Sequence, residues 1–212
     1  MTATLVETPA NRVLLKNISW QTYESLANEV AEQPGIRLTY DRGTLEIMSP
    51  LAPHERYKKL FGRFIESLTE ELNLDVCSLG SFTCKRKNLA RGLEPDQCYY
   101  IQNEALVWDK EEIDLDLDPP PDLAIEIDIT SSSLDRLDIY ANLRIPEVWR
   151  YDSQQVIFYR LEGMEYARCD VSPTFPFLSD TEIQRFLELR KTTKETELLR
   201  LFRQWVKSQL EK

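Results

Sequence analysis

The chain has 212 residues, of which 42% are hydrophobic and 29% charged, and these proportions are typical of a folded globular protein and exclude collagenous and low-complexity classes. A net charge of −10 disfavours a protein that coats nucleic acid regardless of sequence, and it disfavours binding to an anionic membrane surface. The length is near that of one ordinary domain, whose hydrophobic core needs no disulfide or metal for stability.

Two amphipathic helices are predicted in the first third of the chain, because apolar residues recur there at intervals of three and four. The first begins after Ser19, a residue type that caps helix N-termini, and ends at Pro34-Gly35. The second runs from Pro53 to Leu72, with basic residues opposite its apolar stripe. His54 falls on the apolar side, where a core histidine and a functional histidine are both open interpretations.

A β-hairpin is predicted between these helices, because residues 36–49 alternate in polarity around Arg42-Gly43. One face of the hairpin carries the apolar side chains Leu38, Tyr40, Leu45 and Ile47. Glu46 falls on the other face, where a solvated charge is the simplest interpretation.

Three short strands are expected next, around Val76–Ser78, Phe82–Lys85 and Gln97–Ile101. The segment DLAIEIDIT, residues 122–130, then alternates so that its leucine and isoleucines face one side of a strand and its acidic residues the other. The following SSSLDR predicts a helix that is capped at Ser132 and runs to about Leu143.

The C-terminal third predicts a hairpin and a last helix. The hairpin pairs EVWRYD with QVIFYRL around Ser153-Gln154, and the helix begins at Thr192, with Glu195 in a capping-box position. The order of all these elements predicts an α/β (α+β) domain in which helices flank a mixed β-sheet.

The negative charge is concentrated in residues 92–128, which hold twelve acidic residues and one basic residue, while the rest of the chain carries +1. Half of these acidic residues lie in the segment EEIDLDLDPPPD, which is typical of a solvated loop. Four cysteines without a C-x-x-C pair, in a chain with one histidine, indicate buried thiols and no structural zinc site. Together with the absence of a membrane-spanning stretch or a secretory leader, they predict a protein of the reducing cytoplasm with no membrane partner.

Glu126 and Asp128 lie two positions apart on one predicted strand face, which holds their carboxyl groups within about 7 Å of each other. Their repulsion, about 2 kcal/mol at an effective dielectric constant near 20, would be removed by a divalent cation. Oxygen ligands of this kind suit Mg²⁺ or Mn²⁺, which can activate water for attack on a phosphodiester. A strand face that is simply wet and a carboxylate pair for glycoside hydrolysis are the alternatives.

Three blocks of the chain, GTLEIMSPLAPHE, LEPDQCYYI and PPDLAIEIDITSSSLDRLDIYANLRIPEVWRYD, together resemble the Uma-two family of bacterial endonucleases, relatives of the PD-(D/E)xK nucleases. The resemblance covers residues 18–165 and implies a restriction-endonuclease-like fold. It implies a metal-dependent endonuclease that hydrolyses DNA, in which Asp96 and Glu126 hold Mg²⁺ or Mn²⁺ and Asp128 supplements them. Glu46 and His54 match family positions beside the site.

One position departs from the nuclease motif, which ends in a lysine two residues after the glutamate, where this chain has Asp128. The family's alternative, a lysine displaced onto the next helix, corresponds to Arg136, which can neutralise a phosphate but cannot act as a base. Arg136→Ala is therefore expected to abolish cleavage while folding stays nearly intact, and Lys85 and Lys87 are the alternative sources of a lysine. A catalytically inactive nuclease fold that binds nucleic acid or a protein partner is the competing hypothesis.

The resemblance divides the chain into an N-terminal arm (1–17), a restriction-endonuclease-like domain (18–165) and a C-terminal helical extension of the same domain (166–212). The terminal helices are expected to pack on this body or on a second copy of it, which would form a homodimer.

Overall fold

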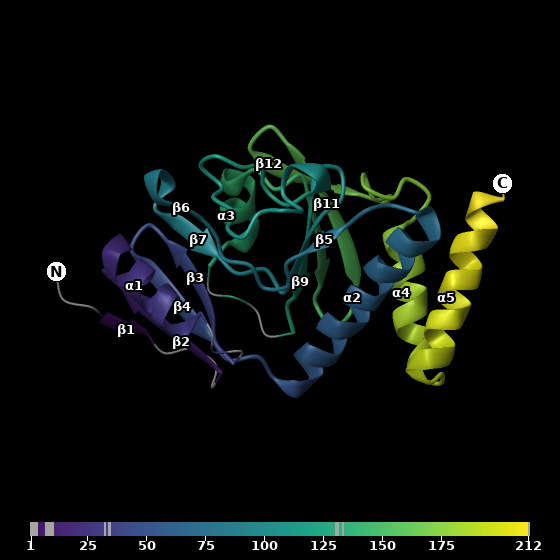
Figure 1. The fold of residues 1–212 in the computed structure, drawn as a ribbon. Helices are drawn as coiled ribbons and strands as arrows, with labels where there is room; N and C mark the ends of the chain where they lie inside the picture. The colour runs from purple at the N-terminus through teal and green to yellow at the C-terminus, as the bar shows by residue number, and fades with distance from the viewer. Residues whose placement is uncertain are drawn as a thin grey trace.

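The computed structural model describes residues 4–6, 11–31, 33, 35–129, 132 and 134–211. These residues form two β-sheets with helices packed against them (Figure 1). The mixed α+β architecture is the one that the order of elements predicted.

The first sheet has the strand order β1-β2-β4-β3-β7-β6, and every neighbouring pair is antiparallel. Its strands are β1 (Thr4–Val6), β2 (Arg12–Lys16), β3 (Arg37–Asp41), β4 (Thr44–Met48), β6 (Cys84–Arg86) and β7 (Arg91–Leu93). The predicted hairpin is β3–β4, and its apolar face is buried as expected. Helix α1 (Trp20–Val30) covers that face, and the Ser19 side chain caps it by accepting a hydrogen bond from the Thr22 N–H.

The second sheet has the strand order β12-β11-β10-β9-β8-β5. Its strands are β5 (Cys77–Ser78), β8 (Gln97–Tyr100), β9 (Leu123–Ile127), β10 (Glu147–Tyr151), β11 (Val156–Glu162) and β12 (Glu165–Cys169). The pair β9–β10 is parallel and the other pairs are antiparallel, which makes the sheet mixed.

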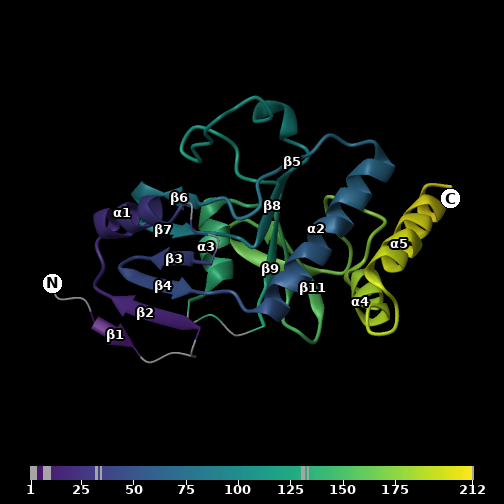
Figure 2. The same ribbon diagram turned by 60° about the horizontal axis from the view of Figure 1, so that its bottom comes forward.

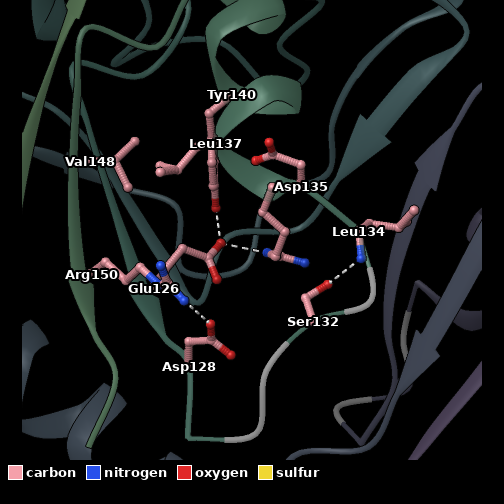
Figure 3. Close-up of a pocket in the computed structure, with 10 residues that line it drawn as sticks. Glu126, Asp128, Ser132, Leu134, Asp135, Leu137, Tyr140, Val148 and Arg150 are labelled. Carbon is pink, nitrogen blue, oxygen red and sulfur yellow. Dashed lines mark hydrogen bonds and ion pairs between the residues drawn. The ribbon is translucent and has the colours of Figure 1, made fainter. Parts of the chain in front are cut away.

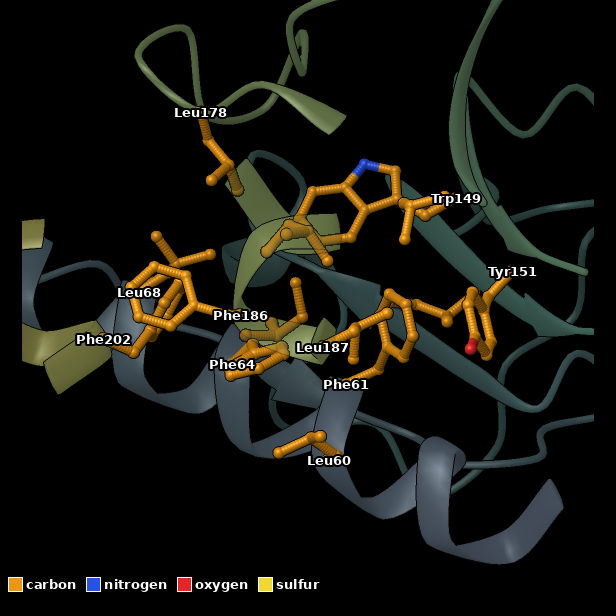
Figure 4. Close-up of a cluster of buried hydrophobic side chains, with 14 of the residues drawn as sticks. Leu60, Phe61, Phe64, Leu68, Trp149, Tyr151, Leu178, Phe186, Leu187 and Phe202 are labelled. Carbon is orange, nitrogen blue, oxygen red and sulfur yellow. The ribbon is translucent and has the colours of Figure 1, made fainter. Parts of the chain in front are cut away.

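Strand β9 divides two layers of packing. Leu123, Ile125 and Ile127 join an aromatic-rich core with α2 (Ala52–Leu72), α4 (Asp180–Leu189) and α5 (Glu195–Leu210), as Figure 4 shows for the side chains around Phe64 and Phe202. Ala124 faces the other way, into a smaller core with α3 (Arg136–Leu143). The alternation predicted for this strand is therefore confirmed for its described residues, and Thr130 lies outside them.

Helix α2 approaches the second sheet closely at Gly62. A Cβ atom on Gly62 would lie 3.1 Å from Nε2 of Gln97, a residue of β8. The Gln97 side chain also donates a hydrogen bond to the Lys58 carbonyl, at 3.4 Å. These contacts fix the first half of α2, which carries His54 and Lys58, beside the start of β8 (Figure 2).

Two predicted helix caps are wrong. Helix α3 is capped by Asp135, whose carboxylate accepts from the Asp138 N–H, whereas the Ser132 hydroxyl donates to Glu46. Helix α5 begins after Lys194 and not at Thr192, whose hydroxyl donates instead to the Leu189 carbonyl. The sequence analysis also missed α4 and the strands β1, β2, β7 and β12. Of these strands, β1 and β7 have three residues each, and β1 and β12 lie at sheet edges.

The acidic segment lies in a loop between β8 and β9 that stands out from the body of the molecule (Figure 2). Asp122 is the last residue of this loop. Its buried carboxylate accepts hydrogen bonds from the backbone N–H groups of Ile101 and Asn103 and so ties the two ends of the loop together. All four cysteines are free thiols, and Cys84 and Cys98 are fully buried. Within the described part of the chain, no helix is long and apolar enough to cross a membrane.

Candidate active site

Asp96 and Glu126 occupy opposed positions where the chain enters the β8–β9 pair. Asp96 directly precedes β8, and the antiparallel register that pairs Gln97 with Ile125 places Asp96 opposite Glu126 when continued by one residue. Opposed residues of an antiparallel pair point to the same face, with Cβ atoms about 4.5–5.5 Å apart. The strand pairing therefore brings together two carboxylates that are thirty positions apart in sequence.

The Asp96 carboxylate is buried and held by two donors. Its Oδ2 atom accepts from Nε2 of His54 at 3.1 Å and from the backbone N–H of Ile127 at 2.8 Å. Burial alone would raise the pKa of Asp96, but the hydrogen bond and the charge of His54 outweigh it and hold the pKa below its ordinary value. Burial would likewise lower the pKa of His54, and Asp96 raises it instead. The two side chains thus stabilise each other's charged forms.

The Glu126 carboxylate is buried against α3. Its Oε1 atom accepts from Nη2 of Arg136 at 2.6 Å. The same atom accepts from the hydroxyl of Tyr140 (Figure 3). Burial raises the pKa of Glu126 to about 6, although the positive charge of Arg136 opposes this rise. Glu126 is therefore close to its titration range at neutral pH.

Arg136 is the first residue of α3 and links the two sheets. Besides Glu126, its guanidinium donates to the Glu94 carbonyl at 2.8 Å and to the hydroxyl of Thr39 in β3. Its side chain is only 15% exposed, which disagrees with the expectation that Arg136→Ala leaves folding nearly intact. A side chain with three hydrogen-bonded partners is part of the folded structure as well as of the site.

Asp128 and Glu46 form a second group of charges next to the first. Asp128 pairs with Nη2 of Arg150 at 2.6 Å, and its other oxygen lies 3.9 Å from Arg12. Arg12 also pairs with Glu46 at 2.6 Å, and Glu46 accepts from the Ser132 hydroxyl at 2.9 Å. Glu46 is 1% exposed and is bonded to Arg12 of β2 and to Ser132, so the interpretation of a solvated charge is wrong.

A pocket of about 130 Å³ opens between α3 and the strands β9 and β10 (Figure 3). Its polar lining residues are Glu126, Asp128, Ser132, Asp135, Arg136, Tyr140 and Arg150. A space of this size accommodates several water molecules or a hydrated cation.

The register of β8 and β9 places two acidic residues, Asp96 and Glu126, at opposed positions. Among the described residues, no group of three or more His, Cys, Asp or Glu side chains is placed to hold a metal ion. Mg²⁺ is commonly bound through one or two carboxylates, with water and substrate oxygens completing its shell. Asp96 and Glu126 meet that requirement in number, and Glu126 also lines the pocket. Oδ1 of Asp128 is a buried oxygen without a hydrogen-bond donor in the described chain. The three-carboxylate set that includes Asp128 stays a prediction.

A family model described as "Putative restriction endonuclease", Uma2, matches residues 20–190. The chain belongs to the Uma2 family. A solved structure from Anabaena variabilis, described as "a putative nuclease belonging to DUF820", is 19% identical, covers 69% of this chain and 88% of its own, and has a TM-score of 0.44. No curated protein matches the chain.

The positions that the Uma2 resemblance singled out come from both sheets and from two helices. Asp96 contacts His54, Glu126 contacts Arg136, and Arg12 joins Glu46 to Asp128. Their catalytic and metal-binding roles stay predictions, but the fold places them as neighbours.

The alternative lysines lie elsewhere. Lys85 and Lys87 line a different pocket, with residues of α1 and of the acidic loop, and Nζ of Lys85 is 3.6 Å from Glu24.

The sequence analysis missed four residues near this site: Arg12, Lys58, Tyr140 and Arg150. The position of Tyr140 contained a usable signal, because a residue four positions after Arg136 lies on the same helix face. The other three had none, since their placement depends on β2 joining the first sheet, on the approach of α2 to β8, and on the parallel register that sets Arg150 beside Glu126.

Proposed function

We propose that this Uma2 protein is a metal-dependent endonuclease that hydrolyses phosphodiester bonds of DNA in the cytoplasm. The observation that carries the proposal is the pair of buried carboxylates, Asp96 and Glu126, opposed across β8 and β9 in a member of this family. The free cysteines are compatible with a reducing compartment.

Asp96 and Glu126 would hold Mg²⁺ or Mn²⁺, which when bound supplies Lewis-acid activation of the phosphodiester and of the attacking water. His54 and the Ile127 N–H fix the Asp96 carboxylate and keep it ionised. The hydroxyl of Tyr140 orients the Glu126 carboxylate from α3.

Arg136 contributes charge. The two carboxylates and the Arg136 guanidinium together carry −1, since each acid is ionised in the form that binds a cation. A divalent cation changes this sum to +1, which attracts a phosphate group. Arg136 thus acts as the counter-ion of Glu126 before the cation binds, and as a phosphate contact afterwards.

The competing function, binding of nucleic acid without cleavage, is favoured by one observation. Glu126 already receives hydrogen bonds from Arg136 and Tyr140, so its carboxylate is satisfied without a cation. In that case, Arg136 is a permanent structural partner that replaces the metal.

Incubation of labelled duplex DNA with Mg²⁺ or Mn²⁺ separates the two functions. We expect cleavage by the wild type, none in EDTA, and a loss of at least about 100-fold in Asp96→Asn, which removes a ligand charge and keeps the side-chain size. Binding of the duplex without cleavage under either metal would establish the competing function.

A further inference from the structure

The pocket beside Glu126 has an apolar wall that the proposed metal chemistry does not use. Of the two proposed ligands, only Glu126 lines the pocket, which lies between α3 and the strands β9 and β10. Its apolar lining residues are Leu134, Leu137 and Val148 (Figure 3). Val148 is buried in the smaller core, and the two leucines pack against that core while they are only partly buried themselves. An apolar surface therefore lies next to a candidate metal ligand.

The charged side chains of the pocket favour a neutral ligand over an anion. Its charged lining residues are three acids, Glu126, Asp128 and Asp135, and two bases, Arg136 and Arg150, which sum to −1. Both bases are already paired, Arg136 with Glu126 and Arg150 with Asp128, each at 2.6 Å. A second phosphate group in this pocket would meet paired cations and an apolar wall, whereas an uncharged ring loses nothing against either.

The size of the pocket suits one flat ring. Its volume is about 130 Å³, and an apolar cavity of about 150 Å³ accepts benzene. A nucleobase has two apolar faces and an edge of hydrogen-bond donors and acceptors, so it needs an apolar wall and a polar rim together. A base inside a duplex is paired and stacked, and it enters a pocket of this kind only when it is turned out of the helix.

The rim of the pocket offers a polar group to such an edge. Asp135 is exposed and is the N-cap of α3, and its Oδ1 atom accepts from the Asp138 N–H at 3.1 Å. The contacts of Asp135 in the described part of the chain use Oδ1, so Oδ2 is able to accept a hydrogen bond from a ligand.

We propose that this pocket receives an unpaired nucleobase next to the phosphodiester that Asp96 and Glu126 hold. The inference rests on the proposed function for the identity of the strand, while the pocket itself rests on its lining and volume. It deepens that function by naming the substrate class: DNA in which the nucleotide at the cut is unpaired, or is turned out of the stack on binding. DNA with a nucleotide that is already unpaired should bind best, because it avoids the cost of opening a base pair.

Binding to three matched duplexes in EDTA, where no strand is cut, tests the proposal. One duplex has a single-nucleotide bulge, the second has the same bulge without its base, and the third is fully paired. We expect the wild type to bind the bulged duplex about tenfold more tightly than the abasic one, because only the first supplies a ring to the pocket. The fully paired duplex should also bind more weakly than the bulged one. Equal affinity for the bulged and abasic duplexes, or no binding of any of the three, would overturn the proposal.

A variant that fills the pocket locates this preference. Leu137→Trp places a large side chain in the pocket and should reduce the affinity ratio of bulged to abasic duplex to about one. Leu210→Trp is the matched control, because Leu210 is also a helical leucine but is 49% exposed at the end of α5, and it should keep the wild-type ratio. Melting curves check that each variant is folded, and Leu134→Trp, which fills the same pocket from the residues before α3, should reproduce the loss. A wild-type ratio in either folded filling variant would overturn the assignment of the base to this pocket.

The outcome is separable from that of the proposed function. A wild type that does not cleave with metal, but prefers the bulged to the abasic duplex in a way that Leu137→Trp abolishes, would refute the nuclease and support the base pocket. Cleavage with metal, without any such preference, would support the nuclease and overturn the base pocket.

Discussion

The two faces of β9 bury their side chains by different means. On one face, Leu123, Ile125 and Ile127 pack against aromatic residues of three helices and need no specific partner. On the other, Glu126 and the adjoining Asp128 are each matched by an arginine from another element. Apolar burial is non-directional, whereas a buried charge requires a particular donor at a particular place. The first face therefore tolerates repacking, and the second depends on single atoms.

This difference also bears on whether Glu126 and Asp128 require a metal ion. The alternation of β9 predicted two repelling charges that a cation would relieve. In the structure, Arg136 pairs with Glu126 and Arg150 with Asp128, so repulsion by itself no longer demands a metal. The case for a cation rests instead on Asp96, which the strand register places opposite Glu126.

The largest expected effect separates the two faces by activity. Glu126→Gln should reduce cleavage at least about 100-fold, because the amide cannot supply the ligand charge. Ile125→Val, one residue earlier on the opposite face, should leave the cleavage rate within about twofold and cost about 1 kcal/mol of stability. Rates measured with Mn²⁺ on one labelled duplex decide the matter, and equal losses in both variants would contradict a catalytic role for Glu126.

The next effect is on stability. Arg136→Ala should lower the free energy of unfolding by about 3–5 kcal/mol, because it leaves the Glu126 carboxylate buried without its cation. Arg136→Lys should lose less stability, because lysine keeps the positive charge although it lacks the planar set of guanidinium donors. Urea unfolding measures both, and a loss below about 1 kcal/mol in the alanine variant would contradict a structural role for the Arg136–Glu126 pair.

The third prediction concerns pH. The pKa of Glu126 is raised to about 6, and a metal binds only the deprotonated carboxylate. The apparent affinity for Mn²⁺ should therefore fall as the pH drops below about 6, approaching tenfold per pH unit. Without metal, the effect of pH on the free energy of unfolding has the opposite direction. Between the unfolded-state and native-state pKa values of Glu126, the native state binds the proton more tightly than the unfolded state does. The contribution of Glu126 to stability therefore falls as the pH rises through that window. An Mn²⁺ affinity that is constant from pH 5 to 8 would show that Glu126 is not a ligand.

The smallest effect belongs to the outer ion pair. Arg150 is 34% exposed at its side chain, so solvent screens its contact with Asp128. Arg150→Met should change the free energy of unfolding by less than about 1 kcal/mol and leave the cleavage rate within about twofold. Chemical denaturation and the same cleavage assay check it, and a loss of activity like that of Glu126→Gln would place Asp128 in the metal site.

The same contrast explains what the sequence could predict. Periodicity located α1, α2, the β3–β4 hairpin and both faces of β9, because a repeating apolar pattern reports local structure directly. The alternation of β9 also identified Glu126, whereas Asp96 came from the resemblance to the Uma2 family, because a local pattern cannot pair two residues from different strands. The burial of Glu46 and the partners Arg12 and Arg150 depend on contacts between distant strands, for which a single sequence carries no signal.

Calorimetric titration with Mn²⁺ at pH 7.5, without DNA, tests most directly that Asp96 and Glu126 together hold one divalent cation. Wild type should bind one Mn²⁺ per chain, and both Asp96→Asn and Glu126→Gln should lose that binding while their melting curves show a folded protein. Equal Mn²⁺ binding by the wild type and either variant would contradict the shared site.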